Sequence, residues 1–125
     1  MRNVLLGIMC ALTLGLAQPV LAQSAEFQQL KAEAMKGDSD SQLELGVMYE
    51  QGDGVEQSYA KAKEFFERAA QQDHPEAQFN LGIMYEHGEG MPKNKKQAIE
   101  WYSKACENGD EDGCAAAQRL DRRLF

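Results

Sequence analysis

Residues 45–54 read Leu-Gly-Val-Met-Tyr-Glu-Gln-Gly-Asp-Gly, and residues 81–90, 36 positions further on, read Leu-Gly-Ile-Met-Tyr-Glu-His-Gly-Glu-Gly. The likeness continues in register, because the pair Phe65-Phe66 aligns with Trp101-Tyr102. A fixed period of this length is typical of stacked supersecondary units. Stacked repeats form binding surfaces more often than active sites, so the period favours a binding protein.

The apolar residues of each unit recur at steps of three and four, as they do on one face of a helix. Leu45, Met48 and Tyr49 follow this spacing in the first half of a unit, and Phe65 and Phe66 follow it in the second half. Nothing alternates with a period of two for long. Each unit is therefore predicted to be a pair of helices, which we name A and B in chain order.

Glycines and small polar residues mark the predicted helix ends. Gly52 and Gly54 can adopt the positive φ with which helices often end. Ser58 and Asn94 occupy matching positions just before helix B, and both are good N-caps. Gly46 lies inside helix A, where glycine costs roughly 1 kcal/mol relative to alanine. That cost is easier to explain if another helix packs closely at this point.

The repeat frame extends beyond the two full units, which are predicted over residues of about 41–76 and 77–112. A lone B-type helix is expected over about 25–36, and a lone A-type helix over about 113–124. Such end helices cover the apolar face that a terminal repeat would otherwise expose. The predicted order is B, A-B, A-B, A, which makes six helices.

The first 22 residues have the features of a secretory signal peptide. Arg2 gives a positive start, the apolar run over residues 4–17 is too short for a comfortable membrane span, and residues 20–22 read Val-Leu-Ala. We expect cleavage before Gln23, which leaves one domain over residues 23–125 without stable membrane insertion. An uncleaved anchor is the alternative.

The chain is acidic, with 13 Lys and Arg against 20 Asp and Glu and a net charge of −7. Removal of the predicted signal peptide (the leader), which contains Arg2, changes the net charge to about −8. An acidic surface argues against binding to nucleic acid or anionic lipid, because phosphates require Lys and Arg. It favours a basic partner that approaches with salt-sensitive kinetics.

The segment over residues 77–94, followed by Ala98, Trp101, Tyr102 and Ala105, closely resembles the Sel-one-like repeat family, short relatives of tetratricopeptide repeats. The resemblance covers nearly all of the chain after the leader. It implies an all-α fold, a short right-handed α-solenoid of antiparallel helix pairs, and a role as adaptor, scaffold, regulator or inhibitor.

Two cysteines, Cys106 and Cys114, follow the leader, and an even count after secretion suggests a disulfide. Residues 104–114 resemble a cysteine-rich bacterial branch of the family, in which cysteines eight apart join the end of helix B to the next helix A. Such a bridge contributes roughly 2–3 kcal/mol. The first unit has Ala70 and Gln78 at these positions and is expected to need no crosslink, because it has neighbours on both sides. The resemblance implies export to a bacterial periplasm, with secretion as the alternative.

Two local motifs suggest chemistry. Ser58-Tyr59-Ala60-Lys61 matches Ser-x-x-Lys, so a β-lactam or cell-wall peptide hydrolase that uses Ser58 and Lys61 is a weaker alternative. Capping of helix B by Ser58 explains this motif better, because the companion motifs are missing. The run from Asn108 to Gly113 resembles the start of a calcium loop, but its twelfth position is Arg119 instead of Glu. We therefore expect no catalytic residue, no cofactor and no metal.

A second row of residues on helix A is the candidate protein-binding face. It follows i, i+4, i+7 spacing in both units and comprises Leu43, Val47, Glu50, Phe79, Ile83 and Glu86. The alternative is that its apolar members are buried between helices.

The sequence thus predicts a non-catalytic protein–protein interaction module of the bacterial cell envelope. Its partner is a protein or peptide, and neither the partner's identity nor the oligomeric state follows from the sequence. An immunity or anti-regulator protein that blocks one envelope toxin or sensor is the alternative within the same class.

Overall fold

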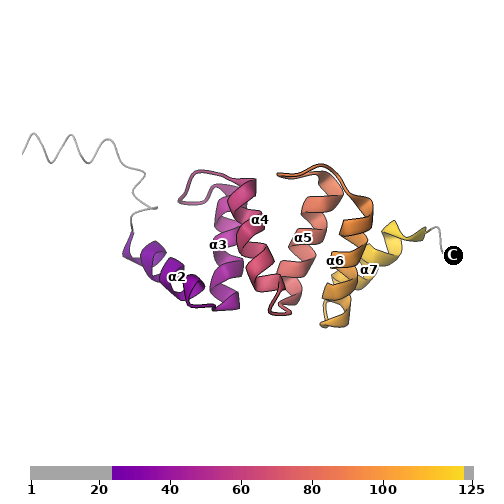
Figure 1. Cartoon of the computed structure of the whole chain (residues 1–125), viewed down its shortest axis with the longest axis horizontal. Coiled ribbons are helices and arrows are strands. Elements are labelled where there is room, and N and C mark those ends of the chain that lie inside the picture. The colour runs from indigo at the N-terminus through magenta and orange to yellow at the C-terminus, as the bar shows by residue number, and fades with distance from the viewer. Residues whose placement is uncertain (1–23, 123–125) are drawn as a thin grey trace, which may run out of the picture.

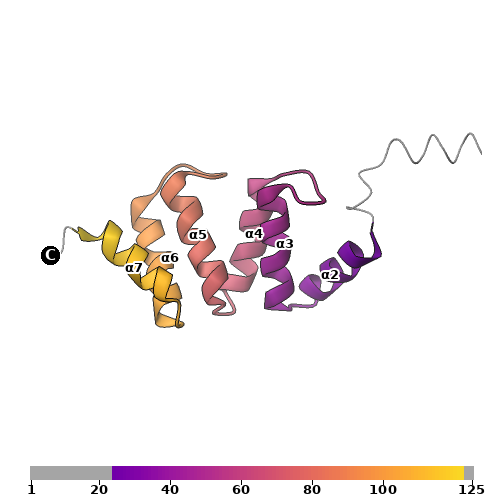
Figure 2. The same ribbon diagram turned by 180° about the vertical axis from the view of Figure 1, so that it is seen from behind.

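A computed structural model describes residues 24–122, so the predicted leader lies outside the described residues. Six α-helices follow one another in this part of the chain: α2 (Ala25–Met35), α3 (Ser39–Gln51), α4 (Tyr59–Ala70), α5 (Pro75–His87), α6 (Lys95–Glu107) and α7 (Glu111–Leu120). They form an elongated row with α2 at one end and α7 at the other (Figure 1). The view from behind in Figure 2 shows the same succession, in which each helix packs against its neighbours in the chain.

The fold is the predicted all-α solenoid in the order B, A-B, A-B, A, and residues 24–122 contain no strand. The predicted capping of the B helices is confirmed. Ser58 Oγ accepts a hydrogen bond from the Lys61 amide at 3.2 Å, and Asn94 Oδ1 accepts one from the Gln97 amide at 3.1 Å. Local side-chain chemistry therefore fixes where α4 and α6 begin.

The A helices begin at residues 39, 75 and 111, so successive starts are 36 residues apart, as the sequence period is. Asp38, His74 and Asp110 cap them in turn. The last helix thus begins two residues before the predicted position 113, because the Asp110 carboxylate accepts a hydrogen bond from the Gly113 amide at 3.1 Å.

The turn between helix A and helix B has the same construction in both units. Gly52 and Gly88 end α3 and α5 with φ of 69° and 74°, as the glycine pattern predicts. The Ser58 amide then donates a hydrogen bond to the Tyr49 carbonyl at 2.8 Å. In the second unit, the Asn94 amide donates to the Tyr85 carbonyl in the same way. These bonds bring the start of each B helix back beside the end of its A helix.

The glycine inside each A helix allows the aromatic side chain of helix B to approach. A Cβ built on Gly46 would lie 2.4 Å from the ring of Phe66, and one on Gly82 would lie 2.5 Å from the ring of Tyr102. Both rings are fully buried, with exposed fractions of 0% and 1%. The predicted close approach of a second helix is therefore confirmed, and it explains why a residue unfavourable to helices occupies this position.

A buried glutamine joins each of the first two B helices, α2 and α4, to the A helix that follows. Gln42 Nε2 donates to the Ala34 carbonyl at 2.9 Å, and Gln78 Nε2 donates to the Ala70 carbonyl at 3.0 Å. Each amide is thus a second donor to a carbonyl at a helix C terminus, which also accepts a bond from the amide of Gly37 or Asp73 in the turn. We name this contact the glutamine latch.

At the next such junction, between α6 and α7, the disulfide takes the place of the glutamine latch. Cys106 and Cys114 are bonded to each other, with their Cα atoms 4.6 Å apart, and align with Ala70 and Gln78. The predicted pairing is confirmed. In the first unit, where no crosslink is expected, the corresponding residues are joined by the hydrogen bond from Gln78 to the Ala70 carbonyl.

Candidate interaction surface

All six residues of the candidate protein-binding face are half-buried. Leu43 and Val47 on α3 pack against the larger core cluster. Phe79 and Ile83 on α5 pack against a second cluster centred on Tyr102, and the Phe79 and Tyr102 ring centroids lie 5.3 Å apart. The apolar members of this row thus contribute to packing between helices, and their contact with a partner stays a prediction.

Glu86, the last residue of the candidate face on α5, links that helix to α6 and α7. Tyr102 Oη on α6 donates a hydrogen bond to its carboxylate at 2.6 Å, and the Arg119 guanidinium on α7 donates two, at 2.7 and 3.0 Å. Arg119, and to a lesser extent Tyr102, hold the pKa of the Glu86 carboxyl below its ordinary value. Burial and the adjacent carboxylate raise the pKa of the Tyr102 phenol, so it stays protonated and can donate.

Replacing Glu86 by glutamine should reduce stability at neutral pH by roughly 1 kcal/mol, a modest value because Arg119 is half exposed. Since the folded-state pKa of Glu86 is lowered, its contribution is present above about pH 4.5 and is lost as the pH falls through the folded-state value. Urea unfolding at pH 6 and at about pH 3 should therefore show a smaller difference between the two proteins at the lower pH. Glu100→Gln, an exposed change on α6, is the control. An equal Glu86→Gln difference at both pH values would contradict this assignment.

The other acidic residue of the predicted face, Glu50, lies at the end of α3. Partial burial, and then the negative charge of Glu89 in the turn of the next unit, raise the pKa of its carboxyl. Among residues 24–122, no basic side chain pairs with the Glu50 carboxylate as Arg119 pairs with that of Glu86. The surface around Glu50 is therefore electronegative. A cationic group of a partner would reduce the repulsion between the carboxylates of Glu50 and Glu89.

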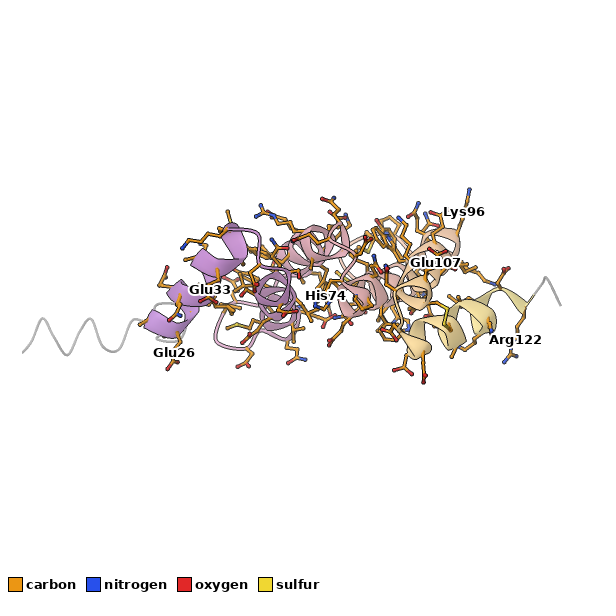
Figure 3. The ribbon with its side chains drawn as sticks, turned by 90° about the horizontal axis from the view of Figure 1, so that it is seen from below. Glu26, Glu33, His74, Lys96, Glu107 and Arg122 are labelled. Atoms are coloured by element: carbon orange, nitrogen blue, oxygen red, sulfur yellow. A yellow bond between two sulfur atoms is a disulfide. The ribbon has the colours of Figure 1, made fainter. Side chains whose placement is uncertain are left out.

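A groove opens between α2 and α3, with a volume of about 540 Å³. Its apolar lining comprises Phe27, Leu30, Val47 and Met48. Its rim carries four carboxylates, those of Glu26, Glu33, Glu44 and Asp53. Figure 3 shows Glu26 and Glu33 on α2, at the opposite end of the row from Arg122. Of the six residues of the predicted face, Val47 alone lines this groove.

Sequence reasoning missed the groove, although the repeat alignment contains a signal for it. Glu26 and Glu33 align with Ala62 and Ala69, which have exposed fractions of 0%. The B helices of the full units bury these two positions against other helices, whereas α2 has a carboxylate at each of them. This difference indicates that no helix among the described residues covers this face of α2.

The residues that suggested chemistry have structural roles. Ser58 caps α4, while the Lys61 ammonium lies over the Tyr49 ring, 5.2 Å from its centroid. Asp110, in the calcium-like run, caps α7. Between residues 24 and 122, no group of three His, Cys, Asp or Glu side chains is arranged to hold a metal ion. In the same part of the chain, no helix is both long and apolar enough to span a membrane.

The model of the Sel1 repeat family matches residues 39–74 and 75–110. These two segments each begin at the first residue of an A helix, α3 or α5. No curated protein matches the chain significantly.

Several solved structures resemble the chain, among them the following three. A Sel1 repeat protein from Oxalobacter formigenes is 32% identical, with a TM-score of 0.71, and the match covers 74% of this chain and 38% of that one. The protective antigen c5321 of uropathogenic Escherichia coli, which has the same repeat fold, is 34% identical over 70% of this chain and 19% of its own, with a TM-score of 0.68. Helicobacter pylori cysteine rich protein B is 31% identical over 71% of this chain and 67% of its own, also with a TM-score of 0.68. The chain therefore spans only a minor part of the first two relatives.

Proposed function

The chain belongs to the Sel1 repeat family, and from this premise we propose that it is a non-catalytic binding module for a protein or peptide in the bacterial cell envelope. Sel1 repeat proteins are generally protein–protein interaction modules. The observation that carries the proposal is an open groove with apolar walls and an acidic rim at one end of a stacked helical array. Apolar surface rimmed by polar residues is typical of interaction sites.

The proposed envelope location is supported by two independent features. The first 22 residues have the composition of a secretory signal peptide. The two cysteines that follow the leader are bonded to each other, and disulfides persist mainly in oxidising compartments such as the bacterial periplasm.

Protein purified from the periplasmic fraction should begin at Gln23 and should not react with a thiol reagent until it is reduced. The reason is that Cys10 leaves with the leader while Cys106 and Cys114 are bonded to each other. Intact mass measured before and after reduction and alkylation would test both statements. Two reactive thiols in unreduced periplasmic protein would contradict the proposed oxidising location, and a chain that retains residues 1–22 would contradict cleavage and favour the uncleaved anchor.

Crosslinking in intact cells tests the binding role. The tagged full chain, expressed with its leader so that the cell processes it, is crosslinked through its lysines, purified under denaturing conditions and identified by mass spectrometry. We expect one or a few envelope proteins in stoichiometric amounts, absent when an unrelated exported protein of similar charge is the bait. Recovery of the same proteins with both baits, or of none, would refute the proposal. A toxin or sensor among the specific partners would favour the immunity or anti-regulator alternative.

A further inference from the structure

We propose that the groove between α2 and α3 binds a basic amphipathic helix of a partner protein. This helix would lie against α2 as α3 lies against α4. The inference rests on the proposed binding function and specifies the site and the chemistry of the partner. Three observations support it: the register of α2, the register of α3 and the charge of the rim.

The first observation is the alignment of α2 with the other B helices. Leu30 on α2 aligns with Phe66 on α4 and with Tyr102 on α6. Those two aromatic rings pack onto the inner glycine of their own A helix, Gly46 or Gly82. Leu30 instead lines the groove and is half-buried. The surface of α2 that faces the groove is therefore the surface with which a B helix binds a helix.

The second observation concerns the opposite wall. Glu44 and Met48 on α3 align, two periods on, with Ala116 and Leu120 on α7. Those residues belong to a cluster that also contains residues of α5 and α6, so they are packed against neighbouring helices. Glu44 and Met48 instead line the groove. Both walls thus present positions that are packed against other helices elsewhere in the array, so the shape of the groove suits a helix.

The third observation determines the chemistry of that helix. Four carboxylates line the groove, and none of its lining residues in the described part of the chain is Lys, Arg or His. Glu33 accepts a hydrogen bond from Gln29 Nε2 at 3.1 Å, which orients its carboxylate without neutralising it. An apolar helix alone would leave these charges facing low-dielectric surface. Lys or Arg on both sides of an apolar stripe would pair with them, which also agrees with the acidic net charge of −7.

Three synthetic peptides probe the groove directly. Each has about 15 residues and an identical leucine stripe at helical spacing, and the remaining positions are mainly lysine, glutamine or glutamate. Binding to the processed full chain is measured by titration calorimetry at low salt and at about 0.5 M salt. We expect the lysine peptide to bind at least fivefold more tightly than the glutamine peptide, less tightly at high salt, and the glutamate peptide not to bind.

Paired variants of the protein locate the site. Glu26→Gln/Glu44→Gln removes two rim charges and should weaken binding of the lysine peptide roughly fivefold to tenfold. Glu100→Gln/Glu107→Gln removes two exposed charges from α6 and should change binding less than about twofold. Leu30→Lys places a cation in the groove and should abolish binding. Circular dichroism and thermal unfolding establish that each variant is folded.

Equal weakening by both glutamine pairs would mean non-specific attraction and would overturn the inference. Equal binding of the lysine and glutamine peptides would overturn the assignment of a basic ligand. A homodimer that Leu30→Lys converts to monomer would make a second copy the occupant and would also overturn it. If crosslinking in cells recovers a specific partner equally well with Leu30→Lys, the groove inference fails while the proposed binding function stands.

Discussion

Replacing Gly82 by alanine should destabilise the protein by about 2–3 kcal/mol, although alanine favours a helix over glycine by roughly 1 kcal/mol. The new Cβ would lie 2.5 Å from two ring carbons of Tyr102, whereas carbon atoms in contact are about 3.5–4 Å apart. Tyr102 is fully buried, and its hydroxyl is bonded to Glu86, so its ring cannot move aside without loss of that bond. The steric cost therefore exceeds the gain in helix propensity.

Urea unfolding monitored by circular dichroism would measure this effect. Gly46→Ala is an informative comparison, because it meets the ring of Phe66, which has no hydroxyl group to hold it. It should cost less than Gly82→Ala. Glu100→Ala, at an exposed position on α6, should change stability by no more than about 0.5 kcal/mol. A Gly82→Ala variant as stable as the parent would show that the helices separate more easily than their packing indicates.

Removing the disulfide with Cys106→Ala/Cys114→Ala should cost about 2–3 kcal/mol and should loosen α7 first. α7 has ten residues, which is too few for a stable helix in water without tertiary contacts. Hydrogen exchange should show lost protection in residues 111–120, while the segments of α3 to α5 keep theirs. Uniform loss of protection over all six helices would contradict a local role of the bridge.

A matched variant tests whether the disulfide and the glutamine latch are equivalent. Cys106→Ala/Cys114→Gln recreates at the last junction the pair found at Ala70 and Gln78. It should recover about 1 kcal/mol relative to the double alanine variant, the usual net contribution of one hydrogen bond. If the glutamine gives no recovery, then the alignment of these positions does not extend to the packing of α7.

The sequence predicts the helices well because their boundaries depend on neighbouring residues. Ser58 and Asn94 cap the helices that follow them, and Gly52 ends α3 with positive φ, as the local pattern indicates. Gly46 is informative for a different reason: its cost within a helix is compensated by a contact between helices, so even a local cost can indicate tertiary packing.

The features that sequence reasoning missed depend on how the helices approach each other. The bond from Gln78 to the Ala70 carbonyl requires the position of α5 relative to the end of α4, which no local pattern specifies. The same holds for Glu86, whose partners Tyr102 and Arg119 come from two other helices. The groove lies outside the candidate face because that face follows from the residue pattern of helix A, whereas one wall of the groove belongs to α2, a B helix.

The unequal links between successive helices have a mechanical consequence. If the two ends of the helical array are pulled apart, the α6–α7 junction is held by a covalent bond, whereas the α2–α3 junction is held by non-covalent contacts, among them the hydrogen bond from Gln42 to the Ala34 carbonyl. The molecule therefore has a strong end and a weak end, and stretching should detach α2 first. Because α2 is also one wall of the groove, a pulling force would open that site before it disturbed the remainder of the array.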